Sequence, residues 1–257
     1  MAQTGSRDPS RESLPVPDAP HRVHETVLSL LDGVKPGRLL DVPAGEGAFA
    51  SQARLKGYEV SCGDIVPARF KVQDLPCQHV DLNERWPYTS EAFDYVVCIE
   101  AVEHVESPWH MIREANRVLS EGGVLFLTTP NVLSIKSRLS YLFYGYPNYF
   151  HYMIEQDETS QTELPIDHIN PVTFLELRHV LARNGFRIER IETNQLLKRR
   201  SVLYRVLKTL MHSRGRSHAR HNSAKAAVRR TLLSDPLLFG ENLIIQARKI
   251  NPVRSAS

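Results

Sequence analysis

Residues 39–47, LLDVPAGEG, constrain the fold of this chain more than any other segment. An apolar run that ends in an acid and passes into a glycine-bearing turn is typical of a buried parallel strand followed by a helix. Gly45 and Gly47 allow the backbone to approach a ligand before the helical sequence AFASQARLKG begins. Because the free N–H groups of such a helix start bind polar ligand groups, we expect a nucleoside-containing cofactor here.

Two more acids follow short strand-like sequences. Asp64 comes after YEVSC, 23 residues beyond Asp41, which is about the distance at which nucleotide-binding sheets place an acid against the ribose hydroxyls. HVDL then places Asp81 after a third brief strand, and FDYVVCIEAVEH runs a fourth buried strand into Glu100 and Glu103. These acids are expected around the mouth of a single site.

The remaining elements follow from periodicity and end signals. VHETVLSLLDGV carries a helical apolar stripe that predicts a helix ahead of the first strand, and PWHMIREANRVLSEGG predicts a helix ending at Gly122 and Gly123. A fifth strand then leads to Pro130. A later helix is predicted with Asn170 as its cap, and it ends at Asn184 before Gly185 and a sixth strand. GENLIIQARK predicts the last strand.

This order of strands and acids resembles that of the class I S-adenosylmethionine-dependent methyltransferases. The resemblance covers roughly residues 22–131 and, more weakly, 168–192 and 240–249, and the ubiquinone-pathway O-methyltransferases are the similar group. It implies an α/β, Rossmann-like fold with a seven-stranded, mostly parallel sheet and helices on both faces. The last strand would be antiparallel and would lie beside the sixth.

The resemblance also implies that the cofactor is S-adenosyl-L-methionine. Asp41 and the glycine turn would cradle the methionine part, Asp64 would bind the ribose, and Asp81 with Leu82 would hold the adenine. The complete predicted cofactor set is Asp41, Pro43, Ala44, Gly45, Gly47, Asp64, Ile65, Asp81, Leu82 and Glu100.

Pro43 departs from the family pattern, which has the form DxGxGxG and places glycine at this position. Proline has no N–H, so one backbone donor to the cofactor is missing. We interpret the site as a variant that still binds; the alternative is a degenerate domain that does not. An NAD-dependent dehydrogenase would share the strand, the turn and the distant acid, but it requires GxGxxG and gives EAVEH no role.

Methyl transfer to a hydroxyl needs a group that removes the acceptor proton. His104 and His168 are the candidate bases, with Glu100 as a third catalytic candidate, because histidine titrates near neutral pH. Alternatively, EAVEH starts a helix and its histidine only packs. Glu100, Glu103, His104 and His168 also form a candidate divalent metal site, and small-RNA end-modifying and ubiquinone-pathway O-methyltransferases look similar here.

The sequence restricts the acceptor more clearly than it identifies it. CIEAVEH lacks the (D/N)PPY pattern that grips a nucleobase amine, and no Pro-Cys pair offers a cysteine nucleophile. A hydroxylated small molecule, a sugar or a lipid-linked compound is the predicted acceptor. The aromatic-rich segment 132–165 is predicted to form a lid over it, with simple packing as the alternative.

Residues 198–230 contain 11 of the 32 basic residues and no acid. This stretch defines a basic helical insertion, residues 196–236, and LLKRRSVLYRVLKTLM within it has the pattern of a basic amphipathic helix. Residues 196–230 are predicted to contact an anionic membrane surface. Packing on the protein is the main alternative. Nucleic acid is less favoured because Tyr204 is the only aromatic residue in the stretch.

The sequence predicts a disordered N-terminal arm over residues 1–20 and one domain over residues 21–257. Cys62, Cys77 and Cys98 show no CxxC spacing and are predicted to be reduced core thiols. No apolar run approaches the 18 residues needed to span a bilayer. The predicted location is cytoplasmic, with peripheral contact to the inner membrane surface. The competing function is a non-catalytic protein of the same fold that docks on a membrane or RNA.

Overall fold

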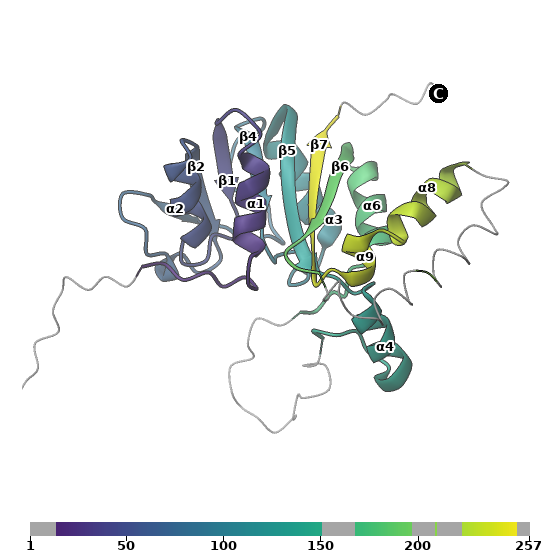
Figure 1. The fold of residues 1–257 in the computed structure, drawn as a ribbon. Helices are drawn as coiled ribbons and strands as arrows, with labels where there is room; N and C mark the ends of the chain where they lie inside the picture. The colour runs from purple at the N-terminus through teal and green to yellow at the C-terminus, as the bar shows by residue number, and fades with distance from the viewer. Residues whose placement is uncertain (1–13, 151–167, 197–208, 210–222, 251–257) are drawn as a thin grey trace, which may run out of the picture.

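The computed structural model describes residues 14–150, 168–196, 209 and 223–250. Seven strands form one sheet in the order β3-β2-β1-β4-β5-β7-β6, with β7 antiparallel to both of its neighbours (Figure 1). The seven-stranded sheet and an antiparallel last strand beside the sixth were both predicted, and both are confirmed. The strands are β1 Arg38–Asp41, β2 Glu59–Asp64, β3 Cys77–His79, β4 Phe93–Cys98, β5 Leu119–Pro130, β6 Phe186–Thr193 and β7 Asn242–Lys249.

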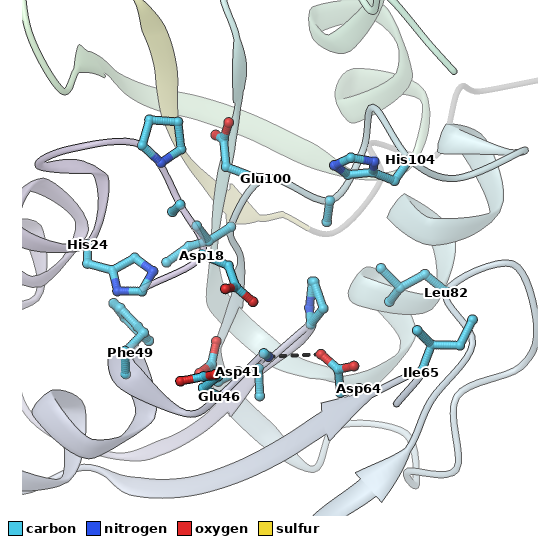
Figure 2. Close-up of a pocket in the computed structure, with 18 of the residues that line it drawn as sticks. Asp18, His24, Asp41, Glu46, Phe49, Asp64, Ile65, Leu82, Glu100 and His104 are labelled. Atoms are coloured by element: carbon cyan, nitrogen blue, oxygen red, sulfur yellow. Dashed lines mark hydrogen bonds between the residues drawn. The ribbon is translucent and has the colours of Figure 1, made fainter. Parts of the chain in front are cut away.

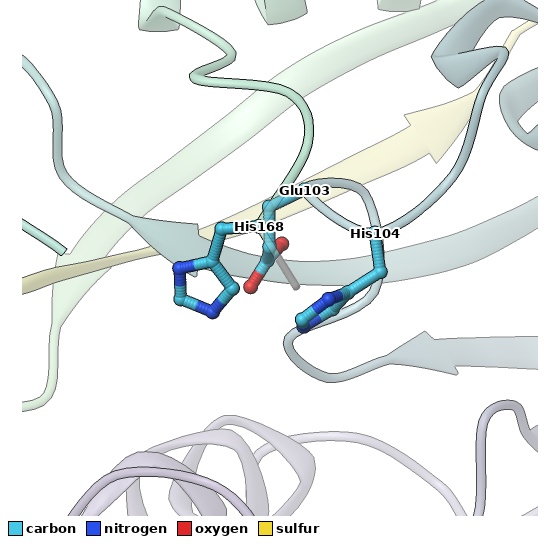
Figure 3. A group of neighbouring side chains, drawn as sticks. All are labelled: Glu103, His104 and His168. Carbon is cyan, nitrogen blue, oxygen red and sulfur yellow. The ribbon is translucent and has the colours of Figure 1, made fainter. Parts of the chain in front are cut away.

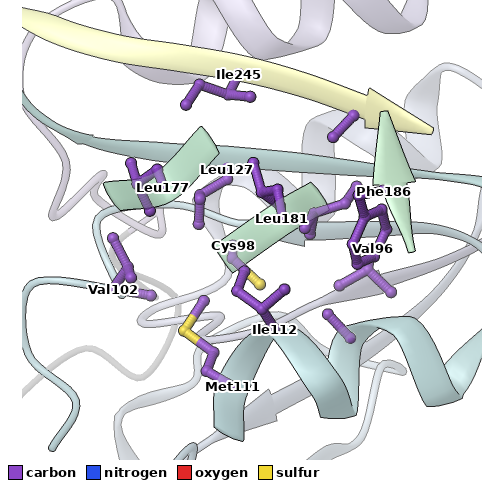
Figure 4. Packing of buried hydrophobic residues seen from close by; sticks show 14 of the residues in the cluster. Val96, Cys98, Val102, Met111, Ile112, Leu127, Leu177, Leu181, Phe186 and Ile245 are labelled. Carbon is purple, nitrogen blue, oxygen red and sulfur yellow. The ribbon is translucent and has the colours of Figure 1, made fainter. Parts of the chain in front are cut away.

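Helices cover both faces of this sheet because neighbouring residues of each central strand point to opposite sides. Leu39 packs with α1 (Val23–Leu31) and α2 (Ala48–Leu55), whereas Leu40 packs with α3 (Pro108–Val118) and α6 (Phe174–Arg183). Figure 4 shows the second of these cores, in which Met111 and Ile112 of α3 lie near Leu177 and Leu181 of α6. The predicted apolar stripe of α1 is buried, as expected: Val23, Val27, Leu28, Leu30 and Leu31.

Two predicted helix boundaries are wrong. Helix α3 ends at Val118 rather than at the glycines, because Leu119 is already extended, fully buried and paired with Phe93 of β4. The register with β4 then shifts before Tyr95 pairs with Val124, so the glycine pair lies inside an irregular part of β5.

Helix α6 is capped by Thr173, whose hydroxyl accepts from the Glu176 N–H at 3.2 Å, and not by Asn170. Asn170 instead binds the loop after β4, and this contact shapes the site described below. The predicted end of the helix at Asn184 is confirmed, with Gly185 at φ 76° directly after it.

The segments outside the sheet are only partly described. Helix α4 (Ile135–Tyr144) follows β5, and α8 (Ser223–Leu232) and α9 (Asp235–Phe239) precede β7. Leu237, Leu238 and Phe239 of α9, which directly follow the basic insertion, are buried. The predicted basic amphipathic helix falls, apart from Leu196 and Thr209, outside the described residues. Within the described part of the chain, no helix is long and apolar enough to cross a membrane.

Candidate functional site

A cavity of about 550 Å³ opens at the carboxyl ends of β1, β2 and β4, where the sequence placed the cofactor. Its size lies within the range of small-molecule sites. Figure 2 shows acidic and apolar side chains around it. Nine of the ten predicted cofactor residues line it: Asp41, Pro43, Ala44, Gly45, Asp64, Ile65, Asp81, Leu82 and Glu100.

Gly47 is the exception, since it does not line the cavity. It lies at the N-cap position of α2 with φ 91°, and an added Cβ would come within 2.5 Å of Val72 and 2.7 Å of Phe70. Its role is therefore to let the turn pack closely against residues 70–72, rather than to contact a ligand.

The Asp64 carboxylate is fixed by two backbone amides. The Gly45 N–H donates to Oδ2 and the Val66 N–H donates to Oδ1, each at 2.8 Å. Asp64 is buried at the end of β2, yet it lines the cavity. This geometry leaves further acceptor capacity on both oxygens for hydroxyl donors of a ligand.

Asp41 lies at the end of β1 and is almost fully buried. Among the described residues no group hydrogen-bonds its Oδ2 atom. Burial, together with the nearby Asp64 charge, raises the pKa of Asp41 well above its ordinary value. A buried carboxylate oxygen without a partner beside an open cavity fits a cationic ligand group, such as the amine of the methionine part of the cofactor.

The turn after β1 keeps its shape despite Pro43. The Ala44 N–H donates to the Gly63 carbonyl at 2.9 Å, and the Gly47 N–H donates to the Ala44 carbonyl at 2.9 Å. Pro43 itself lines the cavity, so the cavity stays open although proline lacks the N–H that glycine would offer to the cofactor. Asp81 also lines the cavity, and its Oδ1 accepts from the Asn83 N–H at 2.8 Å.

One part of the cavity wall was missed in the sequence. Residues 14–20 were assigned to the N-terminal arm, but they pack over the turn after β1. The Val16 N–H donates to Glu46 at 2.9 Å, and Asp18 pairs with Arg69 at 2.8 Å. His24 also lines the cavity, and burial lowers its pKa. Contacts between residues this far apart in the sequence leave no local pattern that predicts them.

The EAVEH segment forms a turn rather than a helix start, because α3 begins only at Pro108. Glu100 adopts φ 47°, and its carboxylate accepts from Thr128 Oγ1 at 2.6 Å and from Asn242 Nδ2 at 2.7 Å. Burial raises the pKa of Glu100 to about 7, and these two hydrogen bonds oppose that rise. Glu100 still lines the cavity.

Three of the four predicted metal-ligating residues come together. Glu103, His104 and His168 each offer one ligand atom, and these atoms lie within 4.8 Å of one another (Figure 3). Glu100 is not part of this cluster, because its carboxylate is bound by Thr128 and Asn242. The predicted four-residue set therefore reduces to three.

Glu103 is the most unusual member of the cluster. Its side chain is fully buried, and within the described residues neither carboxylate oxygen has a hydrogen-bond partner. Burial, and then the neighbouring Glu100 charge, raises its pKa well above the ordinary value. A buried, uncompensated carboxyl next to two imidazoles is costly unless a proton or a cation neutralises it.

His168 has a defined orientation. Its Nδ1 lies 2.9 Å from the Tyr149 carbonyl oxygen, which can only accept. Nδ1 therefore carries a proton, and in the neutral ring Nε2 is the nitrogen that can accept a proton or bind a cation. Its ring packs edge-on against the His104 ring at a centroid distance of 4.7 Å.

Asn170 explains why two segments so distant in the sequence meet. Its backbone N–H donates to the Glu103 carbonyl at 2.9 Å, and its side-chain amide donates to the Val105 carbonyl. The loop before α6 is thereby tied to the turn after β4, which places His168 beside His104.

The predicted aromatic lid is partly described. Tyr149 lines the cavity and its hydroxyl donates to Glu241, whereas Phe150 is buried against His168. The aromatic residues of α4 lie further out and are exposed. Residues 151–165 of the lid fall outside the described part of the chain.

Residues 18–191 match a family model described as a methyltransferase domain. The ubiquinone biosynthesis O-methyltransferase of Paracidovorax citrulli is 28% identical over 124 residues, covering 43% of this chain and 52% of that protein. Its namesake from Alkalilimnicola ehrlichii is 28% identical over 145 residues, covering 53% and 57%. The chain thus spans about half the length of the curated relatives it matches.

A solved structure of a SAM-dependent methyltransferase from Archaeoglobus fulgidus is similar over 88% of this chain and 94% of that one. The TM-score is 0.54 and the sequence identity is 20%. This likeness shows a shared fold.

Proposed function

Because this chain belongs to the class I S-adenosylmethionine-dependent methyltransferases, we propose that it transfers the methyl group of S-adenosylmethionine to a hydroxyl on a small-molecule, sugar or lipid-linked acceptor. The observation that carries the proposal is the cluster of Glu103, His104 and His168, whose two histidines line the cofactor cavity. The similarity to the O-methyltransferases of Paracidovorax citrulli and Alkalilimnicola ehrlichii favours an oxygen acceptor.

The acids at the strand ends support cofactor binding. When bound, S-adenosylmethionine supplies a methyl group activated by a positively charged sulfonium. Asp64 offers carboxylate oxygens to hydroxyl donors, and the unpartnered Oδ2 of Asp41 complements an amine. Asp81 and Leu82, which also line the cavity, would contact the adenine of the cofactor.

The cluster supports deprotonation of a hydroxyl acceptor. Because Nδ1 of His168 donates to the Tyr149 carbonyl, Nε2 is the basic nitrogen of the neutral ring. His104 and His168 both line the cavity, so an acceptor hydroxyl there lies within reach of an imidazole base. Tyr149 and Glu241, whose side chains are hydrogen-bonded to each other, also line the cavity and would orient the acceptor.

We also propose that the cluster holds a divalent cation. One carboxylate and two imidazoles suit ions that accept nitrogen as well as oxygen ligands, such as Mn²⁺ or Zn²⁺. The fully buried Glu103 carboxylate, with no partner among the described residues, is what such an ion would neutralise. A bound cation would lower the pKa of an acceptor hydroxyl.

Transfer of a labelled methyl group to a panel of phenols, catechols and sugars tests the function. We expect turnover with a hydroxyl acceptor and loss of at least about a hundred-fold in Glu103→Gln and His168→Asn variants. A Glu59→Gln variant, changed at an exposed site on β2, is the control. Binding of S-adenosylmethionine with no transfer to any acceptor would instead support the non-catalytic alternative.

Chelation separates the two ways of activating the hydroxyl. If a cation is required, exhaustive chelation should abolish turnover and Mn²⁺ or Zn²⁺ should restore it. If turnover survives chelation but is lost in His168→Asn, the imidazole acts as a base without metal.

A further inference from the structure

Helix α4 ends in a cluster of exposed apolar side chains. Leu142, Phe143 and Tyr144 are 73%, 71% and 71% exposed, and Leu139 and Tyr141 are 45% and 49% exposed. We call these five residues the α4 apolar tip. Figure 1 shows α4 projecting beyond the carboxyl edge of the sheet, away from both cores. Contiguous exposed apolar residues of this size mark an interaction surface rather than a folding core.

The contacts of α4 with the protein are made elsewhere on the helix. Ile135, at its start, packs with Leu238 and Phe239 of α9. Ser137 is the only α4 residue with a buried side chain, and its hydroxyl accepts from the Asn148 N–H at 2.9 Å. The base of the helix is therefore anchored. The side chains of the tip remain exposed, with the Tyr144 ring near the rings of Phe143 and Tyr146.

The surroundings of the tip are basic. Residues 131–150 contain no acid, and Lys136 on α4 is exposed. Helix α8 likewise contains no acid and carries Lys225, Arg229 and Arg230, all exposed. Helix α9 packs against both α4 and α8. The helix that carries the apolar tip and the basic helix therefore share this short helix as a packing partner.

We propose that the α4 apolar tip docks this protein on an anionic lipid bilayer, with Lys136 and the basic residues of α8 facing the lipid headgroups. Peripheral binding combines burial of apolar side chains at the headgroup boundary with attraction between basic residues and anionic lipids. Tyrosine is enriched at the membrane–water boundary of membrane proteins. The tip contains two tyrosines, Tyr141 and Tyr144. This assignment moves the insertable surface from the basic insertion to α4, and it does not depend on the acceptor.

Docking at α4 would also place the cavity near the membrane. The chain passes from α4 to Tyr149 within five residues of the end of the helix, and Tyr149 lines the cavity. An acceptor that enters from the bilayer surface would therefore contact Tyr149 and Glu241, which line the cavity.

Sedimentation of the full chain with vesicles tests the proposal, using phosphatidylcholine alone and phosphatidylcholine mixed with phosphatidylglycerol. We expect binding to the anionic vesicles that weakens as salt increases. The double variant Leu142→Glu and Phe143→Glu should lose at least about ten-fold in binding. Arg229→Glu with Arg230→Glu should weaken binding to the anionic vesicles only.

Leu55→Glu is the matched control. Leu55 is 80% exposed but ends α2, which runs from the carboxyl edge of the sheet back toward its amino edge. This control should bind vesicles as the wild type does. Titration with S-adenosylhomocysteine should show unchanged binding in every variant, which separates loss of docking from loss of the cofactor site.

The proposal is overturned if the wild type does not sediment with anionic vesicles, or if the α4 variant sediments as well as the Leu55→Glu control. It is also overturned if light scattering shows that the wild type is a dimer and the α4 variant a monomer, while the wild type does not bind vesicles. In that outcome the tip is an interface between two copies of the chain.

Discussion

The amide of Gly45 donates to Oδ2 of Asp64 at 2.8 Å, which joins the glycine turn after β1 to the acid at the end of β2. The two strands concerned are parallel neighbours in the sheet, and both residues line the cavity. The hydrogen bond sets the direction of the carboxylate before any ligand arrives. Preorganisation of this kind reduces the ordering cost of binding.

Gly47 is expected to tolerate no side chain. Gly47→Ala should lower the free energy of unfolding by about 2 to 4 kcal/mol, because a left-handed backbone and an overpacked Cβ both add cost. Gly33→Ala is the matched control, since an added Cβ there meets nothing within 4 Å. Urea denaturation should leave that control within about 1 kcal/mol of the wild type. Equal stability of the two variants would contradict this account of the turn.

Asp41 is expected to make the ligand-free protein less stable as the pH rises. Its folded-state pKa lies well above the ordinary 3.8, so between the two values the folded state holds a proton that the unfolded state has lost. Stability therefore falls as pH rises through that window. In thermal melts, the melting temperature of Asp41→Asn relative to that of the wild type should increase from acid to neutral pH. A difference independent of pH would show that Asp41 is not protonated in the folded protein.

Asn170 is expected to position the cluster rather than to touch substrate. Asn170→Ala leaves the Val105 carbonyl unsatisfied and should cost about 1 to 2 kcal/mol of stability. It should also weaken Mn²⁺ binding by about ten-fold, since it frees the loop that carries His168. Thr173→Ala, which removes the cap of α6, should cost about 1 kcal/mol. Calorimetric titration should show that this control binds Mn²⁺ with the affinity of the wild type. An equal loss of Mn²⁺ affinity in both variants would indicate a general folding defect.

The parts of this molecule that the sequence predicted are those encoded locally. The first strand was predicted over residues 39–42 and lies at Arg38–Asp41. This strand, its glycine turn, and the acids Asp64 and Asp81 each follow a short pattern whose period or spacing determines their place in a parallel sheet. The end of α6 was predicted for the same reason, since Asn184 and Gly185 carry the signal themselves.

What the sequence did not predict depends on contacts between distant segments. Asn170 has the composition of a cap, but the carbonyls of Glu103 and Val105 bind it more than 60 residues away, and Thr173 takes the cap position. Glu100 has the spacing of a metal ligand with Glu103, but Thr128 and Asn242 bind its carboxylate. Tertiary partners decided both outcomes.

Calorimetric titration with S-adenosylmethionine and S-adenosylhomocysteine tests the central claim most directly, comparing the wild type with Asp64→Ala and with Glu59→Ala on the same strand. We predict that the wild type and Glu59→Ala bind both ligands. Asp64→Ala should lose about a hundred-fold in affinity, because hydrogen bonds to a charged group contribute about 1.5 to 3 kcal/mol each. Absence of heat with either ligand in a folded wild type, or undiminished binding by Asp64→Ala, would contradict the claim that this cavity binds the methyl donor.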